Sequence, residues 1–361
     1  MTRGERVISE VPVELGDRSY TVHIGSGVRH DLPGIVAAAG AARAVVVTAR
    51  PPEWTPDPGV PSVVIPAQDG EAGKTLAAVE RLCGEFARFG LHRSDVVISC
   101  GGGTTTDTVG LAAALYHRGT PVVHLPTSLL AQVDASVGGK TAVNLPAGKN
   151  LAGAYWQPRA VLCDTDYLGT LPERERINGL GEIARCHFIG AGDLRPLSTH
   201  EQIVASVARK AEIVAADECD GGLRHLLNYG HTLGHALERA TDFSLRHGEC
   251  VAIGTVFAGR LAHALGRITP HRAAEHHDVV RHYGLPAALP PDADVASLVR
   301  LMRLDKKATT GLTFVLDGPH GAELVGDVPE AAVVTALAGM PRELTHRSEN
   351  RCVPSSAADH A

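Results

Sequence analysis

Three histidines and one glutamate are the residues of this sequence best suited to bind a metal ion. His231 and His235 are four residues apart, which places them on one face of a helix at a common spacing of metal ligands. His247 follows in the segment RHGE, and Glu182 is a carboxylate within an otherwise apolar segment. Histidines with one carboxylate, leaving a coordination position open, are typical of a catalytic zinc site.

The alternative is structural, because a single histidine is more often a hydrogen-bonded group than a ligand. Three histidines close to glycines favour the metal. The segment HTLGH lacks the glutamate that activates water in the HExxH motif of zinc proteases, so we do not expect peptide hydrolysis. Proton chemistry on a bound polyol fits these residues better.

A glycine-rich segment offers a second kind of site. The apolar run Val96–Ser99 leads through Cys100 into Gly101, Gly102 and Gly103, and a helix is expected to begin near Thr108. A strand, a glycine turn and a helix N-terminus form a cradle for an anion, because the backbone can approach closely and free N–H groups point at a phosphate. The segment is neither GxGxxG nor a P-loop, and a tight turn without a ligand is the alternative.

Two lysines that follow glycines suit a phosphorylated polyol. Lys140 ends the segment VDASVGGK, which also contains Asp134, and Lys149 lies in GKN. The alternative for Lys140 is an exposed turn without a ligand.

The elements that must position these residues alternate between strands and helices in the first half of the chain. Four continuous apolar runs are separated by helix-length amphipathic segments, which favours a parallel sheet covered on both faces, as in doubly wound nucleotide-binding folds. The runs are Ala44–Thr48, Val63–Ile65, Val96–Ser99 and Val122–Leu125. Before them, Arg6–Leu15 and Tyr20–Ile24 predict a hairpin around Gly16-Asp17.

The second half of the chain is expected to be mainly helical. Helix-period apolar residues occur over Ile203–Asp217, Leu223–Thr241 and Glu249–Ala264. We therefore expect a cofactor-binding α/β domain over residues 1–172, a helical metal- and substrate-binding domain over 173–342, and a disordered tail over 343–361.

Composition excludes several classes of function. The 361 residues carry 34 Lys+Arg against 40 Asp+Glu, a net charge of -6, which argues against a nucleic-acid or polybasic membrane binder. No apolar stretch has the length of a membrane span, and the first residues lack the apolar core of a signal peptide. Seven scattered cysteines without a CxxC pair indicate reduced thiols. We expect a cytoplasmic protein with small-molecule partners.

These motifs together resemble the dehydroquinate synthase family, the sugar phosphate cyclases. The similarity covers about residues 10 to 340, and the motifs occur in the family's order: GGGxxxDxxG, HxRG, PTSLLAQVDASVGGKT, GKN, GLGEI, NYGHTLGHALE, RHGE and DKK. The resemblance implies an N-terminal Rossmann-like NAD domain with a doubly wound parallel sheet, a C-terminal mainly helical domain with zinc or cobalt, and a homodimer.

The resemblance also implies a closed redox cycle. Bound NAD oxidises a ring hydroxyl, phosphate is eliminated β to the new ketone, the ketone is reduced again, and an intramolecular aldol step closes the carbocycle.

The family's functional residues match positions of this sequence one by one. The implied metal ligands are Glu182, His231 and His247. The implied cofactor contacts are Gly102, Gly103, Thr104, Asp107, Thr127, Ser128, Lys149, Glu71, Lys74 and Thr170. The implied catalytic and substrate residues are Asp134, Lys140, Asn150, Arg185, Lys210, Arg224, Asn228 and His235. The implied phosphate contacts are Lys140, Asn150, Lys306 or Lys307, and Arg118 supplied across the dimer interface.

The sequence departs from the family pattern at three places. Arg185 stands where ordinary dehydroquinate synthases have a lysine, and a planar guanidinium is not a conservative replacement. Thr104–Thr106 replaces an apolar pair and glycine. The aspartate expected after the AVVVT strand is missing, and Arg50 there would tolerate a 2′-phosphate, so NADP stays open beside NAD.

The substrate prediction depends on which branch of the family the chain resembles. Lys210, Arg224 and Asn228 suit a substrate with a carboxylate, which favours a 2-keto acid heptulosonate. The segments GGGTTTDTVGLAAALYHRG and NGLGEIARCHFIGA are most similar to the aminodehydroquinate synthases of 3-amino-5-hydroxybenzoate and ansamycin biosynthesis, which cyclise amino-DAHP. We place Arg185 near the amino substituent.

Three other functions stay open. The first is a 3-dehydroquinate synthase acting on DAHP in the shikimate pathway. The second is a metal-dependent polyol dehydrogenase, which would release NADH, although a small uncharged polyol needs no group of cations. The third is a binding protein without activity, although such a protein would be expected to have lost a metal ligand.

Overall fold

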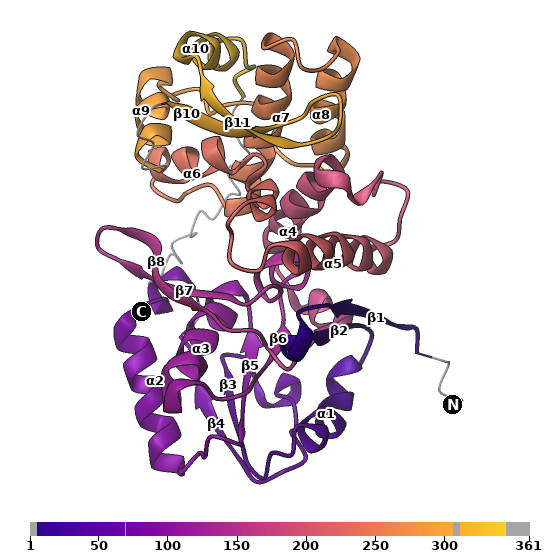
Figure 1. The fold of residues 1–361 in the computed structure, drawn as a ribbon, viewed down its shortest axis with the longest axis vertical. Helices are drawn as coiled ribbons and strands as arrows, with labels where there is room; N and C mark the ends of the chain where they lie inside the picture. Colours follow the sequence, from indigo (N-terminus) through magenta and orange to yellow (C-terminus); the bar gives the residue numbers. More distant parts are fainter. Residues whose placement is uncertain (1–5, 69, 306–310, 344–361) are drawn as a thin grey trace, which may run out of the picture.

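A seven-stranded sheet forms the first half of the chain in the computed structural model, which describes residues 6–68, 70–305 and 311–343 (Figure 1). The strand order is β1-β2-β9-β6-β5-β3-β4, and only β1 runs antiparallel to its neighbour. The strands are β1 (Ile8–Val13), β2 (Tyr20–Gly25), β3 (Ala44–Thr48), β4 (Ser62–Pro66), β5 (Val96–Gly101), β6 (Val122–Pro126) and β9 (Ala160–Asp164). The predicted hairpin and the four predicted runs are confirmed as β1 to β6.

Helices cover both faces of this sheet, because each central strand has apolar side chains on both sides. Val46 of β3 packs with α1 (Leu32–Ala38), whereas Val45 and Val47 pack with α2 (Leu76–Phe89) and α3 (Gly103–Leu115). Successive residues of a strand point to opposite faces, so a continuous apolar run predicts this arrangement. The doubly wound fold class is confirmed.

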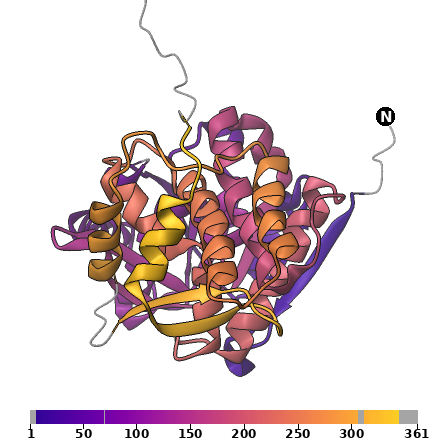
Figure 2. The same ribbon diagram turned by 90° about the horizontal axis from the view of Figure 1, so that it is seen from above.

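The second half of the chain is mainly helical, as predicted (Figures 1 and 2). Its helices are α4 (Glu173–Cys186), α5 (Thr199–Ala216), α6 (His231–Ala240), α7 (His247–Ala264), α8 (Pro270–His282), α9 (Val295–Asp305) and α10 (Glu330–Ala338). A hairpin of β10 (Leu312–Leu316) and β11 (Glu323–Val328) lies along one side of them (Figure 2). Among the helices that the structure describes, none has both the length and the apolar character needed to cross a membrane.

One expectation about local structure is wrong, and one hairpin was not predicted. The segment Leu223–Thr241, expected as one helix, is a 3-10 turn over Leu223–Asn228 followed by α6, because Gly230 adopts a φ of 77° that interrupts the helix. The segment that follows Lys140, for which no helix or strand was predicted, forms a separate hairpin of β7 (Lys140–Leu145) and β8 (Gly148–Tyr155). This hairpin projects beside the helical half (Figure 1).

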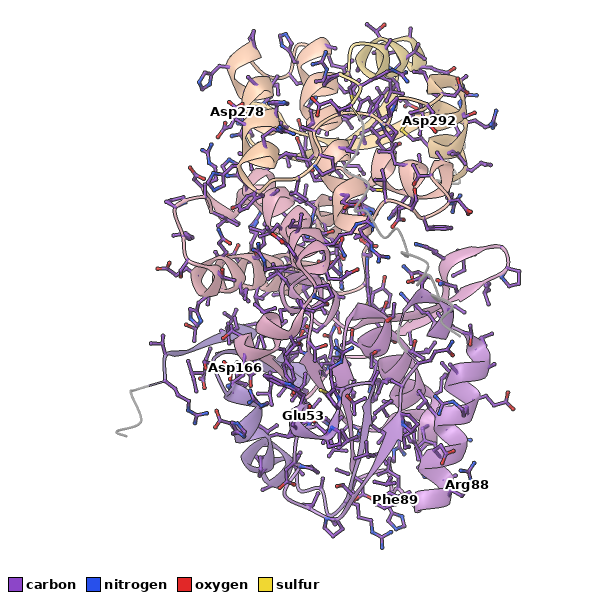
Figure 3. All side chains as sticks on the ribbon, turned by 180° about the vertical axis from the view of Figure 1, so that it is seen from behind. Glu53, Arg88, Phe89, Asp166, Asp278 and Asp292 are labelled. Atoms are coloured by element: carbon purple, nitrogen blue, oxygen red, sulfur yellow. The ribbon has the colours of Figure 1, made fainter. Side chains whose placement is uncertain are left out.

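The carboxyl ends of the parallel strands β2 to β6 and β9 face the helical half. Figure 3 places Arg88 and Phe89, at the end of α2, at the far end of the sheet half, whereas Asp278 and Asp292 mark the helical half. Strand β5 starts from that far end and therefore reaches its glycine turn at the edge facing the helices. The strand order reverses between β3 and β5, and ligands of such sheets bind at this point.

The two halves share one continuous core. Val11 of β1 and Ile24 of β2 belong to the same apolar cluster as Val133, which follows β6, and Ile203 and Val207 of α5. The boundary at residue 172 therefore stays a prediction. The expected tail over 343–361 lies outside the described residues except for Glu343.

Helices α4 and α7 cross at a pair of glycines. A Cβ on Gly248 would lie 1.8 Å from the carbonyl oxygen of Asn178, and one on Gly181 would lie 2.3 Å from the carbonyl oxygen of Gly248. The crossing therefore requires both glycines. It brings together Glu182, which follows Gly181, and His247, which precedes Gly248.

We predict that Gly248→Ala lowers the free energy of unfolding by about 1–3 kcal/mol, because the added methyl overpacks two backbones. Urea unfolding measures the change. Gly84→Ala in α2 is the control, because a Cβ there meets open space, and it should be neutral or stabilise the chain. Equal stability of Gly248→Ala and the unchanged protein would contradict the close crossing.

Candidate active site

Glu182, His231 and His247 converge where α4, α6 and α7 meet. The Oε1 atom of Glu182 lies 3.1 Å from Nε2 of His247 and 3.4 Å from Nε2 of His231. These three ligand atoms lie within 4.8 Å of one another, and Glu182 is fully buried. Spacing of this kind allows one cation to contact all three atoms.

The far nitrogen of each histidine ring is held by an oxygen. Nδ1 of His231 lies 3.1 Å from the carbonyl oxygen of Tyr229, and Nδ1 of His247 lies 3.1 Å from Oε1 of Glu238. Because each oxygen can accept a hydrogen bond from Nδ1–H, both Nε2 atoms are left to turn a lone pair toward a cation shared with Glu182. This donor set fits a divalent metal ion.

Electrostatics keep the Glu182 carboxylate charged. Burial alone would raise its pKa, but the Arg185 guanidinium and His231 outweigh burial and hold the pKa of Glu182 well below its ordinary value. A charged carboxylate is the form that a metal ion binds.

Glu238 belongs to this site, although the sequence analysis assigned it no role. It lies near His235 and His247 in a second group of potential ligands, and it is 6% exposed. Its signal was helical spacing, since Glu238 follows His231 by seven residues and His235 by three. The ring centroid of His235 lies 5.4 Å from that of His231. His235 therefore borders the Glu182 group, which is Glu182, His231 and His247.

Arg185 joins the Glu182 group to a second ion pair. Its Nε donates to Oε2 of Glu182, its Nη1 donates to the Leu227 carbonyl at 3.0 Å, and its Nη2 lies 3.4 Å from Oδ1 of Asp134. Asp134 also accepts from Nζ of Lys210 at 2.7 Å. Burial would raise the pKa of Asp134, but Lys210 and Arg185 together lower it. The charges of these residues therefore balance within one network.

Lys140 and Asn150 lie on the β7–β8 hairpin, and Arg224 contacts the turn that precedes it. Nζ of Lys140 lies 2.7 Å from Oδ2 of Asp220, and Nη2 of Arg224 donates to the Gly138 carbonyl at 2.6 Å. Asn228 is half-buried at the end of the 3-10 turn before α6. Asn150 is exposed on β8, and its N–H donates to Oδ1 of Asn144 at 3.0 Å.

Lys149 connects the hairpin to Glu238, which in turn contacts His247. Its Nζ lies 3.6 Å from Oε1 of Glu238 and 4.2 Å from the centre of the Phe243 ring. The predicted cofactor residue Lys149 therefore lies on the side of the hairpin that faces α6.

The glycine turn after β5 fits a phosphate group. Gly102 caps α3 without a side-chain hydrogen bond, so the first N–H groups of the helix can face a ligand. Thr127 donates its N–H to the Gly101 carbonyl at 2.9 Å, and a Cβ on Gly102 would lie 3.6 Å from Oγ of Ser128. Gly103 and Ser128 thus lie at the same edge of the sheet.

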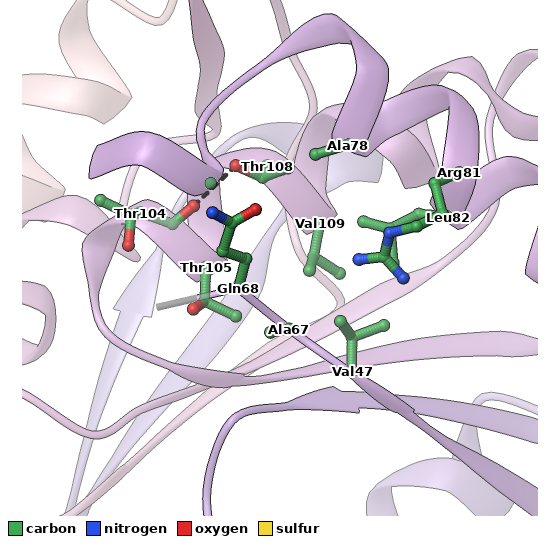
Figure 4. Close-up of a pocket in the computed structure, with 11 residues that line it drawn as sticks. Val47, Ala67, Gln68, Ala78, Arg81, Leu82, Thr104, Thr105, Thr108 and Val109 are labelled. Carbon is green, nitrogen blue, oxygen red and sulfur yellow. Dashed lines mark hydrogen bonds between the residues drawn. The ribbon is translucent and has the colours of Figure 1, made fainter. Parts of the chain in front are cut away.

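A small pocket opens beside this turn, at the point where the strand order reverses (Figure 4). Val47, Ala67, Thr104 and Thr105 are among the residues that line it. Oγ1 of Thr105 is buried and has no hydrogen-bond partner among the described residues. An unpartnered hydroxyl beside an uncapped helix start fits a dinucleotide at this edge.

Lys74 and Asp107 form an ion pair next to this turn. Nζ of Lys74 donates to Oδ2 of Asp107, and burial raises the pKa of Asp107 to about 6 against the effect of Lys74. Glu71 accepts from Nδ2 of Asn144 at 2.6 Å. Thr170 donates its hydroxyl to the Tyr167 carbonyl at 2.7 Å in the turn after β9.

Arg118 is the described candidate that the fold does not bring to this site. It is exposed in the turn after α3, at the opposite end of that helix from Gly103. Lys306 and Lys307 lie outside the described residues.

Comparison with known proteins identifies the family of this chain. The family model of the 3-dehydroquinate synthase N-terminal domain matches residues 64–178, and the family model of the C-terminal domain matches residues 179–308. The chain belongs to the 3-dehydroquinate synthase family. It is therefore an enzyme of the sugar phosphate cyclase type, as the resemblance implied.

Two curated relatives cover most of the chain. A protein of Amycolatopsis mediterranei (strain S699) named "Putative aminodehydroquinate synthase" is 72% identical over 92% of this chain and 95% of its own length. The 3-dehydroquinate synthase of Mycobacterium leprae (strain TN) is 42% identical over 78% of this chain and 82% of its own length.

Solved structures share the fold. A 2-epi-5-epi-valiolone synthase of Streptomyces hygroscopicus subsp. jinggangensis 5008 with NAD+ and Zn2+ bound has a TM-score of 0.77 and 28% identity, over 90% of this chain and 97% of its own. A 2-deoxy-scyllo-inosose synthase complexed with carbaglucose-6-phosphate, NAD+ and Co2+ has a TM-score of 0.82 and 23% identity, over 92% of this chain and 99% of its own.

We predict that Glu238→Gln weakens zinc binding by about 10- to 100-fold, because the His247 ring loses the carboxylate that orients it. Competition with a chromogenic chelator measures the affinity without any need for turnover. The matched control is Glu212→Gln, an exposed carboxylate on α5 that pairs with Arg209. Unchanged zinc affinity in Glu238→Gln would show that Glu238 does not orient His247.

Proposed function

We propose that the chain is an aminodehydroquinate synthase. It converts amino-DAHP, 4-amino-3,4-dideoxy-heptulosonate 7-phosphate, into 5-amino-5-deoxy-3-dehydroquinate and releases phosphate. The observation that carries this proposal is the 72% identity to the Amycolatopsis mediterranei protein, against 42% to the Mycobacterium leprae 3-dehydroquinate synthase.

Cofactors follow from the two donor sets described above. Glu182, His231 and His247 would hold zinc or cobalt, and the glycine turn after β5 with Thr127 and Ser128 would hold NAD. When bound, the metal polarises the alcohol that is oxidised and NAD accepts and returns its hydride.

The residues of the chain would bind and orient a doubly anionic substrate. Lys210 and Arg224 would supply positive charge for a carboxylate, and Lys140 would supply it for a phosphate. In the structure these three cations contact Asp134, the Gly138 carbonyl and Asp220. Lys210 and Arg185 hold the carboxylate of Asp134 in its charged form. It can therefore accept a hydrogen bond from an O–H or N–H group of the substrate. His235 lies beside the metal-ligand group, where an imidazole can move a proton.

Arg118 fits a role across a subunit interface. It is exposed at the end of α3 remote from the glycine turn, so within one chain it does not reach the same site. We propose a homodimer in which Arg118 of one protomer contacts the phosphate held by its partner.

The second candidate is a 3-dehydroquinate synthase acting on DAHP. Relatives with this name, such as the Acidithiobacillus ferrooxidans protein at 38% identity over 90% of this chain, favour it. A polyol dehydrogenase has less support, since the structure of a "probable glycerol dehydrogenase" from Sinorhizobium meliloti 1021, at 18% identity and a TM-score of 0.60, shows the fold alone.

Phosphate release from purified protein with zinc or cobalt and NAD tests the proposal on amino-DAHP and DAHP in parallel. We expect a higher kcat/KM on amino-DAHP and no net NADH, because the hydride returns within each turnover. Comparable turnover of DAHP would assign the chain to the second candidate. Net NADH would indicate a dehydrogenase, and inactivity on both substrates would contradict the proposal.

Arg185→Lys tests the substrate preference directly. A lysine cannot contact Glu182, the Leu227 carbonyl and Asp134 together as the guanidinium does. We expect the kcat/KM ratio of amino-DAHP to DAHP to fall by about tenfold. Arg176→Lys on the exposed side of the same helix is the control. An unchanged ratio in Arg185→Lys would overturn the role of Arg185 in this preference.

A further inference from the structure

The turn before Lys140 is held by hydrogen bonds on both of its peptide groups. The N–H of Gly138 donates to the Tyr20 hydroxyl at 2.8 Å, and the carbonyl of Gly138 accepts from Nη2 of Arg224 at 2.6 Å. These two groups belong to the peptide planes on either side of the Gly138 Cα. Together the bonds fix both dihedral angles of a residue whose φ is 92° and which has no Cβ to restrict it.

Tyr20 reaches this turn from β2, far away in the sequence. The side chain is 5% exposed and packs in the core that the two halves share, and burial raises the pKa of its hydroxyl. The hydroxyl is therefore neutral and accepts a hydrogen bond from the Gly138 N–H within the core. Its removal would leave the buried Gly138 N–H without a partner.

A second contact joins the hairpin of β1 and β2, which carries Tyr20, to the loop that carries Arg224. Arg18, which precedes β2, pairs with Glu218 at 2.5 Å, and Nε2 of Gln157 donates to Glu218 at 3.0 Å. Two residues later, Asp220 pairs with Lys140. The hairpin of β1 and β2 therefore contacts both segments that present the cations of the substrate pocket.

We propose that Tyr20 is a positioning residue of the substrate pocket. Its hydroxyl fixes the Gly138–Gly139 turn, and through that turn it fixes Lys140 and Arg224. This inference rests on the proposed function only in assigning these two cations to the phosphate and the carboxylate of the substrate. Tyr20 contacts neither the phosphate nor the carboxylate of the substrate. It determines the positions of Lys140 and Arg224.

The matched pair of variants is Tyr20→Phe and Tyr116→Phe. Both remove one hydroxyl from a tyrosine of the sheet half, but the Tyr116 hydroxyl donates to the Leu91 carbonyl at 3.2 Å, between α2 and β5. Any general cost of losing a tyrosine hydroxyl appears in both variants, whereas an effect on the pocket appears only in Tyr20→Phe.

The first measurement is amide hydrogen exchange of the full chain, which needs no activity. In Tyr20→Phe we expect peptides covering residues 136–141 and 217–224 to exchange about tenfold faster, and the α2 peptide to be unchanged. Tyr116→Phe should leave the 136–141 peptide as in the unchanged protein. Unchanged exchange of residues 136–141 in Tyr20→Phe would overturn the proposal.

The second measurement is the steady-state kinetics of phosphate release. We expect Tyr20→Phe to raise the KM about tenfold for the preferred heptulosonate phosphate while kcat changes less than about threefold, because misplaced cations weaken substrate binding. Faster exchange with unchanged KM would make Tyr20 structural only and would overturn the positioning role. Inactivity of the unchanged protein would overturn the proposed function instead, and the exchange comparison would then decide whether Tyr20 holds the turn.

Discussion

The need to compensate the buried charge of Glu182 is the constraint on which the rest of the structure depends. A buried charge without partners is strongly destabilising, so the fold must bring compensating groups to it. Arg185 occupies one carboxylate oxygen, and His231 and His247 face the other. That arrangement requires α4 and α7 to approach as closely as Gly181 and Gly248 allow. The packing of two helices and the donor set for a metal ion are therefore one constraint.

Contacts that start at Glu182 continue into both halves of the chain. On one side His247 leads to Glu238 and Lys149 of the β7–β8 hairpin. On the other side Arg185 leads to Asp134, just after β6, and to Lys210 of α5. Because β6 lies next to β5, the same contacts link Glu182 and its histidines to the part of the sheet that carries the glycine turn. A hydride can pass between cofactor and substrate only if the distance between them is fixed.

The sequence predicted what repeats locally and missed what depends on distant contacts. Continuous apolar runs gave β3 to β6 within a few residues, and helical spacing placed His231 beside His235, but the group around Glu182 joins His231 to His247 of another helix. The contact of Arg185 with Asp134 and the hydrogen bond between Tyr20 and Gly138 could not be predicted, because these pairs are 51 and 118 residues apart in the sequence. The β7–β8 hairpin was missed because its glycines and lysines are typical of a loop, and only pairing of the two strands gives them a regular structure.

A crystal structure of the zinc-loaded chain, with anomalous diffraction recorded at the zinc edge, tests the central claim most directly. The account predicts one zinc peak in contact with Oε1 of Glu182 and the Nε2 atoms of His231 and His247, with Arg185 still bonded to Oε2. A zinc peak elsewhere, or a Glu182 that binds zinc through both oxygens after Arg185 has moved away, would contradict it.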